Sequence, residues 1–144
     1  MSYEVFGAKR KLDLKKLQEG EEIIKSLIQV SRGVIEIALI VGEDGLPVIH
    51  YSPQGIDVDP LSASTTALIG ALNAALSLLG ITGYSRVDVR MEDNSHLILK
   101  PLPRSENILV IKTSPNPNLG LIYYLIDKYS QKISDILQLS LIHI

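Results

Sequence analysis

The sequence has 144 residues, a formal net charge of −2 and no cysteine. A chain of this length can bury a hydrophobic core, so we expect a single domain. The small negative charge argues against nucleic acid as a partner, because gripping a phosphate backbone requires a basic surface. The lack of cysteine excludes disulfides and thiolate chemistry and fits a reducing compartment. The first 16 residues lack the apolar core of a secretory signal, so we expect a cytoplasmic protein.

The chain begins with a basic arm over residues 1–13, which carries three consecutive cationic residues at 9–11. We expect a solvated arm, with a weak role at a membrane surface or on an acidic partner as the alternative. An amphipathic helix is predicted next, from the helical spacing of Leu14, Leu17, Ile24, Leu27 and Ile28. Gly20 is expected to loosen or split this helix, and Gly33 to end it.

A hairpin follows the first helix. Residues 34–41, VIEIALIV, are β-branched and nearly continuous, which is typical of a central strand covered on both faces. The Asp44-Gly45 pair then predicts a tight turn, because glycine accepts the positive φ that such turns require. Residues 46–51 should therefore return antiparallel to the first strand.

Three more strands and a helix are predicted in the second half. Residues 84–91, YSRVDVRM, alternate strictly between apolar and polar, and the runs 96–102 and 107–113 complete a five-stranded sheet. A last helix opens near Pro117, with an apolar face of Leu119, Ile122, Ile126, Tyr129, Ile133 and Ile136. Residues 138–144 are predicted to form an apolar tail after a domain that spans residues 14–137.

The segment 57–80 is predicted to be one long helix and is the most unusual part of the chain, because no charged residue follows Asp59. Asp57 or Asp59 can cap its start, Pro60 suits the first turn, and Gly80 stops it. A helix without a charged face requires cover on more than one side. We expect a second protein chain to provide it. The alternatives are a membrane span, which the Ser, Thr and Asn content and the missing basic flanks oppose, and a fully internal core helix.

Three faces of this helix can be assigned at about 100° per residue. The face expected to lie on the sheet comprises Leu61, Thr65, Leu68, Leu72, Ala75 and Leu79. One flank carries small residues and one leucine, namely Ser64, Ala67, Ala71, Ala74 and Leu78. The positions expected to lie outermost are Ala63, Thr66, Gly70, Asn73 and Ser77. Small residues allow another backbone to approach closely.

In chain order the elements predict an α+β sandwich, with an antiparallel sheet between helical layers. The run GVIEIALIVGEDGLPVIHYSPQGIDVDPLSA, the alanine-rich helix, the alternating strand and the late SPNPNLGLI together resemble the roadblock/dynein light-chain domain. The resemblance covers about Leu17 to Ile133. It implies a roadblock-like (profilin/longin-type) sandwich in the order α-β-β-α-β-β-β-α. One long helix would lie on one face of the sheet and the N- and C-terminal helices on the other.

The resemblance also implies a homodimer, in which the long helices lie antiparallel and the third strands meet edge to edge. The implied interface comprises Ser64, Ala67, Ala71, Ala74 and Leu78 on the helix, with Arg86, Val87, Asp88, Val89 and Arg90 on the strand. If the strands pair around Val87 or Val89, an arginine of one copy faces Asp88 of the other, which is favourable. We predict this register; the alternative is a plain solvated face of an edge strand.

Members of the family typically act as non-catalytic partners of small Ras-like GTPases, or as scaffolds and motor light chains. One bacterial relative accelerates GTP hydrolysis by its partner. Carried to this sequence, the resemblance suggests a GTPase-binding face of Ser62, Thr66, Ile69, Asn73 and Ser77, with Asp59 at its rim. The alternatives are an ordinary exposed helix surface, and a dimeric scaffold or small-molecule sensor without a GTPase partner.

The sequence carries no motif for catalysis or cofactor binding. The phosphate loop, the dinucleotide fingerprint, the zinc-protease motif and the serine-hydrolase elbow are all absent. His50, His96 and His143 are far apart, so we expect neither a metal nor a cofactor. A hydrolase that uses Glu36 or Asp88 as acid or base is a weaker alternative without a nucleophile. We therefore expect a non-enzymatic, cytoplasmic, archaeal protein without stable membrane insertion.

Overall fold

The computed structural model describes residues 14–142. The predicted basic arm, residues 1–13, and residues 143–144 lie outside the described part. The elements in chain order are α1 (Leu14–Val30), β1 (Ile35–Val41), β2 (Pro47–Tyr51), α2 (Asp59–Leu78), β3 (Val87–Arg90), β4 (His96–Pro101), β5 (Ile108–Thr113) and α3 (Leu119–Ile142). The predicted order of helices and strands is confirmed.

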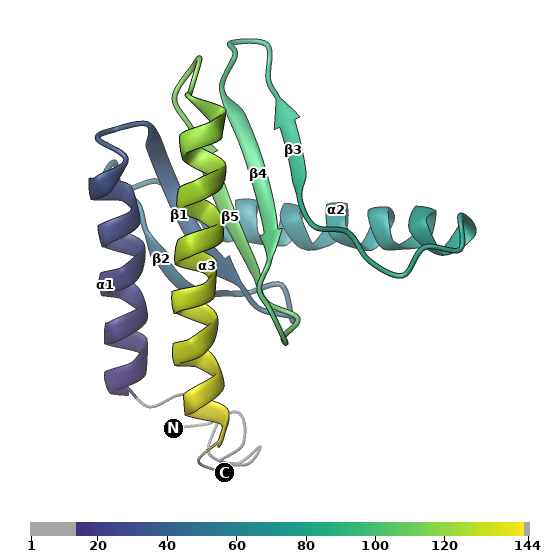
Figure 1. Ribbon diagram of the computed structural model, residues 1–144, viewed down its shortest axis with the longest axis horizontal. Helices are drawn as coiled ribbons and strands as arrows, with labels where there is room; N and C mark the ends of the chain where they lie inside the picture. Colours follow the sequence, from purple (N-terminus) through teal and green to yellow (C-terminus); the bar gives the residue numbers. More distant parts are fainter. Residues whose placement is uncertain (1–13, 143–144) are drawn as a thin grey trace.

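The five strands form one antiparallel sheet in the order β2-β1-β5-β4-β3 (Figure 1). The strand predicted to be central, β1, pairs with β2 on one side and β5 on the other. The hairpin turn lies where expected, and Gly45 has a φ of +85° that a larger residue rarely adopts. β2 and β3 are the two edges of the sheet.

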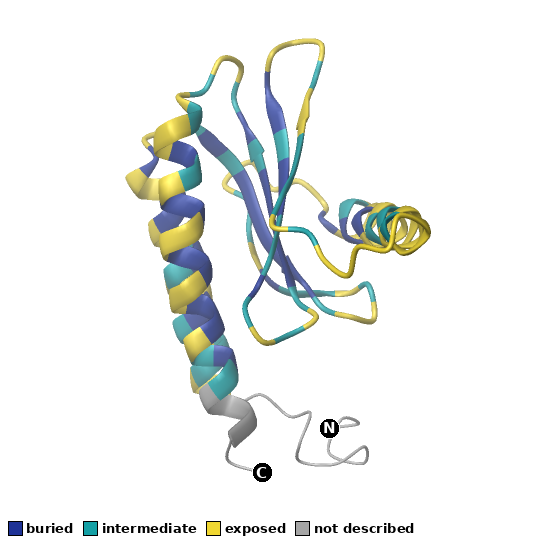
Figure 2. Ribbon diagram, turned by 45° about the vertical axis from the view of Figure 1, so that its right-hand side comes forward, coloured by how far each residue is buried: buried dark blue, intermediate teal, exposed yellow. Residues whose placement is uncertain are grey.

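The sheet separates two helical layers. α1 and α3 lie side by side on one face, and α2 lies alone on the other (Figures 1 and 2). The hydrophobic core therefore has two parts, one on each face of the sheet. Ile24, Leu27 and Ile126 belong to the larger cluster, beneath α1 and α3, and Leu39 and Val110 to the smaller one on the α2 side. This arrangement confirms the α+β sandwich with one long helix opposite the terminal pair.

Gly20 does not split α1, which runs unbroken through it. The glycine instead lets the helix backbone approach β2, because a Cβ at this position would lie 2.4 Å from Cδ1 of Ile49. That contact is shorter than real carbon atoms allow, so a larger residue at this position would require the terminal methyl of Ile49 to move. The predicted loosening of the helix is wrong, since close packing compensates for the poor helix propensity of glycine.

The ends of α2 follow the prediction only in part. Gly80 has a φ of +74°, and the N–H of Ile81 donates to the carbonyl of Leu76 at 2.9 Å, so the predicted stop is confirmed. The cap position is Val58, which has no capping side chain, and the Asp57 carboxylate accepts from the N–H of Asp59, the first residue of the helix, at 3.1 Å.

α3 continues to Ile142, so residues 138–142 of the predicted tail belong to the helix. The start is also later than expected, at Leu119, where the Asn118 side-chain oxygen accepts from the N–H of Leu121 at 3.2 Å. An asparagine cap of this kind satisfies one of the free N–H groups of the first turn.

Candidate functional site

α2 lies on the sheet with a face rotated from the one predicted. Of the predicted inward residues, Thr65 is buried and Leu61 and Leu72 are half-buried, whereas Leu68, Ala75 and Leu79 are exposed. Ser62, which was not among them, is buried, and Leu76 is half-buried. At about 100° per residue, the helix is turned by about 60° from the predicted orientation. The reason is a hydrogen bond from the Ser62 hydroxyl to the carbonyl of Gly45 at 2.7 Å, which docks the β1–β2 turn on the helix.

This rotation corrects two members of the predicted GTPase-binding face. Ser62 has no exposed surface, and Ile69 is half-buried in the α2-side core, so neither points outward as predicted. Thr66, Asn73 and Ser77 are exposed, and so is Asp59 at the start of the helix. The part of this face that a partner can reach is therefore mainly polar, and Ile69 at its centre is only partly accessible.

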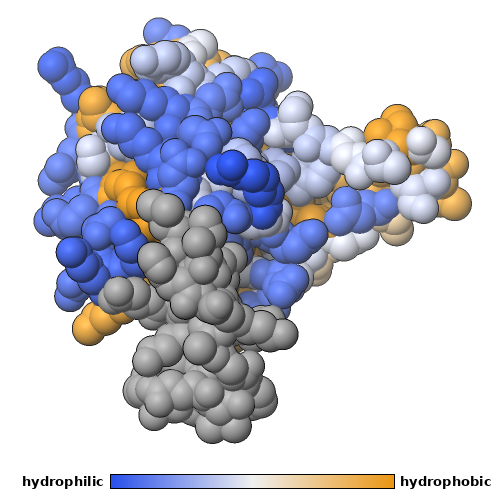
Figure 3. Space-filling view, turned by 60° about the horizontal axis from the view of Figure 1, so that its bottom comes forward, coloured by the Kyte–Doolittle hydropathy of each residue, from blue (hydrophilic) through white to orange (hydrophobic). Residues whose placement is uncertain are grey.

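The opposite face of α2 points away from the molecule and carries the predicted dimer flank. Its members Ser64, Ala67, Ala71, Ala74 and Leu78 are all exposed, and Leu78 is 90% exposed. The C-terminal half of the helix projects beyond the sheet (Figure 1). In space-filling view the tip of this projection is hydrophobic (Figure 3), and the exposed apolar residues there include Leu78, Leu79 and Ile81.

By length and composition, α2 could also cross a membrane, and it is the one helix among residues 14–142 that meets this criterion. Its first half, however, is held against the sheet by Ser62 and Thr65, and its inner residues contribute to the core. The exposed apolar surface therefore belongs to a helix that is already one layer of a sandwich.

A groove of about 770 Å³ lies between α2 and the ends of the strands. Thr66, Asn73 and Ser77 line its helix side. Its other sides are formed by the end of β1 and the turn after it, the β4–β5 turn and the loop 80–84 before β3. The three exposed polar residues predicted to bind a GTPase thus share a hollow that the sequence did not indicate.

The groove has three chemical features. Its charged lining, within the described part of the chain, consists of Glu43 and Glu106, both acidic. The side-chain oxygen of Thr65 lies at the same groove and is the buried side-chain polar atom without a hydrogen-bond partner among residues 14–142. Burial, with the charge of Glu106 adding to it, raises the pKa of the Tyr84 hydroxyl on the groove lining.

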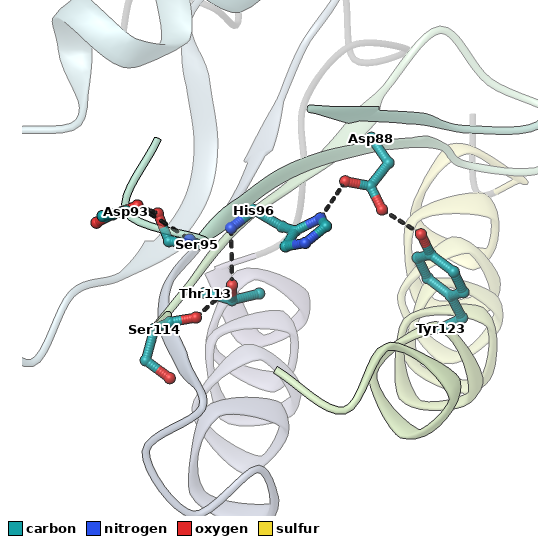
Figure 4. A network of polar contacts seen from close by, with 7 residues as sticks. All are labelled: Asp88, Asp93, Ser95, His96, Thr113, Ser114 and Tyr123. Carbon is teal, nitrogen blue, oxygen red and sulfur yellow. Dashed lines mark hydrogen bonds and ion pairs between the residues drawn. The ribbon is translucent and has the colours of Figure 1, made fainter. Parts of the chain in front are cut away.

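At the β3 edge, Asp88 connects three elements (Figure 4). Its carboxylate accepts from Nδ1 of His96 on β4 at 2.5 Å and from the hydroxyl of Tyr123 on α3. The bond to Asp88 is the main cause that raises the pKa of Tyr123. The Arg86 guanidinium stacks over the Tyr123 ring, 3.6 Å from its centroid. This network fastens the edge strand to α3.

The network changes the interpretation of the alternating strand. Arg86 and Asp88 share one face, as predicted, but that face lies toward α3 and both residues are half-buried, so a plain solvated face is wrong. Asp88 has two partners within its own chain, which the predicted pairing with an arginine of a second copy did not foresee. Arg90 and Val89 are exposed at this edge, and Val87 packs toward α2. His96 reaches Asp88 because β3 pairs with β4. No local pattern in the sequence indicates this contact between the two side chains.

The two carboxylates considered for acid–base chemistry are not brought together. Glu36 on β1 accepts from Nζ of Lys112 at 2.5 Å, whereas Asp88 lies on β3, three strands away. At about 4.8 Å between neighbouring strands, the separation is about 14 Å. Among the described residues no three His, Cys, Asp or Glu side chains converge as metal ligands. His143 lies outside the described residues, and His50 is exposed on β2.

The fold defined by these layers is that of the Roadblock/LC7 domain. The chain superposes on the Roadblock/LC7 domain of Streptomyces avermitilis with a TM-score of 0.71 and 17% identity, over 82% of this chain and 97% of that one. Myxococcus xanthus MglB superposes with a TM-score of 0.78 and 16% identity, over 89% of this chain and 94% of that one. A structure described as MglB with a tetrameric arrangement superposes with a TM-score of 0.77 and 16% identity, over 90% of this chain and 95% of that one.

No family model matches the sequence. A sequence relative is the uncharacterised protein MJ0714 of the archaeon Methanocaldococcus jannaschii, 29% identical over 96 residues, which are 67% of this chain and 79% of the relative. The structural likeness at low identity establishes the shared fold. What the fold does in this chain depends on the surfaces described above.

Proposed function

We propose that this chain is a non-catalytic, homodimeric roadblock-type regulator or adaptor that binds a small Ras-like GTPase in an archaeal cytoplasm. The observation that carries the proposal is α2: a long helix without a charged residue after Asp59, exposed over its outer face and projecting beyond its own sheet. An uncharged, unpaired helix face is stable in water only when another surface covers it.

A second copy is the proposed cover. The outer face of α2 is built from alanine and serine, which allow two helix backbones to approach closely. β3 lies at the edge of the sheet and has β4 as its one neighbour among residues 14–142, so its outer side can continue the sheet into a partner. A twofold axis would place both features in one self-complementary interface.

The GTPase is proposed to contact the helix face beside the groove. Asp59, Thr66, Asn73 and Ser77 are exposed there and provide polar groups of the kind found around protein interfaces. The family resemblance supplies the class of partner. No three metal-ligating side chains converge among the described residues, and we propose that any effect on GTP hydrolysis acts through positioning the GTPase.

The test is single-turnover GTP hydrolysis by the small Ras-like GTPase of the same organism, together with direct binding in the GDP and GTP states. Thr66→Arg and Asn73→Arg should abolish binding, because each adds a long charged side chain to an exposed contact position. Gln29→Arg is the matched control, since it adds the same charge on exposed α1, on the other side of the sheet. Binding without acceleration would define an adaptor, and no binding in either nucleotide state would refute the GTPase proposal.

The groove favours a second candidate, a scaffold or sensor that takes a small molecule. Its volume of about 770 Å³ falls within the range of about 300–1,000 Å³ that is common for ligand sites. Native mass spectrometry of the purified protein would show a bound small molecule as a discrete added mass. A sensor should retain that mass in wild type and lose it in Thr65→Arg, where the new side chain fills the groove.

A further inference from the structure

We propose that the basic N-terminal arm, residues 1–13, binds in the groove between α2 and the strand ends of its own chain. The inference does not depend on a GTPase partner. It follows from the charge of the groove, from an unsatisfied polar group in it, and from the place where the described chain begins.

The charges of the groove and the arm are complementary. Glu43, at the β1–β2 turn, and Glu106, at the β4–β5 turn, are the charged residues that line the groove within the described chain. Lys9, Arg10 and Lys11 are consecutive in the arm. Opposite charges at the rim of a hollow attract each other more strongly than on a flat surface, because the low-dielectric walls focus the field.

The groove also contains a polar group that requires a partner. Thr65 is 3% exposed, lines the groove, and its hydroxyl makes no hydrogen bond to any of the described residues. A buried hydroxyl without a partner is unfavourable, and such groups are nearly always satisfied in native proteins. This hydroxyl has almost no accessible surface, so a segment in the groove bonds to it when the Thr65 side chain turns toward the groove. The segment then supplies backbone N–H and C=O groups, and a lysine supplies an ammonium donor.

The arm leaves the fold at the end of the sheet where the groove opens. The start of α1 lies beside the end of α3, because Lys15 and Ile136 line one shallow hollow. The neighbouring Asp135 pairs with Arg104 of the β4–β5 turn at 3.3 Å. This turn also contributes Glu106 to the groove.

The arm is long enough for the crossing. Packed layers lie about 10 Å apart, so the path from the α1–α3 layer to the α2 layer is about 20 Å. Residues 9–11 precede Leu14 by three to five positions, a reach of about 10–17 Å before the lysine side chains are counted. The whole arm of 13 residues extends to about 45 Å.

The experiment uses the full chain, which has no native cysteine. Ala8→Cys carries a nitroxide spin label beside the basic residues, and amide signals of the ¹⁵N-labelled protein report its position. We expect the label to broaden Gly42, Gly70 and Ser77, which line the groove, and to leave Asn94 at the opposite end of the sheet sharp. The broadening should vanish at about 1 M salt, where the Debye length falls to about 3 Å.

Charge reversal shows whether electrostatic attraction causes the broadening of the groove signals. Glu106→Lys should return the groove signals to their unlabelled intensity, whereas Glu92→Lys, the same charge change in the β3–β4 turn, should not. Lys9→Glu with Lys11→Glu should have the same effect as Glu106→Lys. These two changes lie outside the described fold, so they serve as the second test if Glu106→Lys fails to fold. Thr65→Val, which removes the unsatisfied hydroxyl, should weaken the broadening.

Three results would overturn the proposal. The first is sharp groove signals in the labelled wild-type chain. The second is broadening that Glu106→Lys and the arm reversals leave unchanged, which would show contact without charge recognition. The third is broadening that persists when spin-labelled chains without ¹⁵N are mixed with ¹⁵N chains that carry no spin label, which would place the arm in the groove of a second copy.

Discussion

Ala71 lies at the centre of the outward face of α2, and its replacement by glutamate tests whether a second copy covers this helix. The exposed apolar residues on and next to this face are Leu68 (41%), Leu78 (90%), Leu79 (70%) and Ile81 (49%). Complete burial of one fully exposed side chain of this kind contributes about 1.5–3 kcal/mol. The four exposed fractions together equal about 2.5 such side chains, so covering them would contribute roughly 4–7 kcal/mol per chain.

A twofold dimer doubles this contribution to roughly 8–14 kcal/mol. Association costs about 4–15 kcal/mol in lost translational and rotational freedom, so the net free energy of dimerisation is predicted to be small. Ala71→Glu places two unpaired carboxylates in the interface, each with a desolvation cost of several kcal/mol. We expect the dissociation constant to rise at least about 100-fold, which corresponds to about 2.8 kcal/mol.

Sedimentation equilibrium over a range of concentrations measures this constant directly. Gln29→Glu is the control, because it makes the same charge change on exposed α1, on the other side of the sheet. An Ala71→Glu variant that dimerises as tightly as wild type would refute the proposed interface. A control that dissociates to the same extent would show that net charge, and not the covered helix, sets the association.

Three further predictions concern the packing and the polar network. Gly70→Ala, with nothing within 4 Å of its Cβ, should stabilise the fold by about 0.5–1 kcal/mol through helix propensity. Gly20→Ala should gain less, because its Cβ would lie 2.4 Å from the terminal methyl of Ile49, which must move; urea unfolding measures both, and equal effects would contradict the close contact. Tyr123→Phe removes the hydrogen bond to Asp88 and should lower the free energy of unfolding by about 1–2 kcal/mol in the same assay. In an Asp88→Asn background the same substitution should lower it by less, and additive effects of the two substitutions would argue against the bond. The pKa of Tyr123 is raised in the folded protein, so the contribution of its hydroxyl to folding stability is complete below pH 10, the ordinary tyrosine pKa, and is lost as the pH rises through the folded value. The difference in unfolding free energy between wild type and Tyr123→Phe should therefore shrink above pH 10. A difference that stays constant with pH would refute this linkage.

Much of the fold could be predicted because its signals are local. The β-branched run ending at Val41, the turn at Gly45 and the helix stop at Gly80 each follow from the conformations that these residues prefer. The absence of charge after Asp59 is likewise visible in the sequence and indicated an exposed helix that requires cover. The order of helices and strands was therefore predictable before any tertiary contact was known.

The candidate site was predicted less well, because its residues are selected by contacts between distant segments. Thr66, Asn73 and Ser77 are exposed as expected, but the groove that they line depends on where the strand ends stop. Ser62 was placed outward on the family resemblance, whereas its hydroxyl bonds to the carbonyl of Gly45, 17 residues away, and the side chain is buried. Periodicity gives the spacing of a face, but only a neighbouring element decides which face is buried.

The sequence by itself determined the elements of this protein, their order and the uncharged surface of its longest helix. Only the tertiary structure decided the rotation of α2, the close approach of Gly20 to Ile49 and the attachment of Asp88 to His96 and Tyr123. The physical reason is the range of the interactions. Backbone preference acts over a few neighbouring residues, whereas burial and hydrogen-bond partners are supplied by segments that meet only when the sheet has formed.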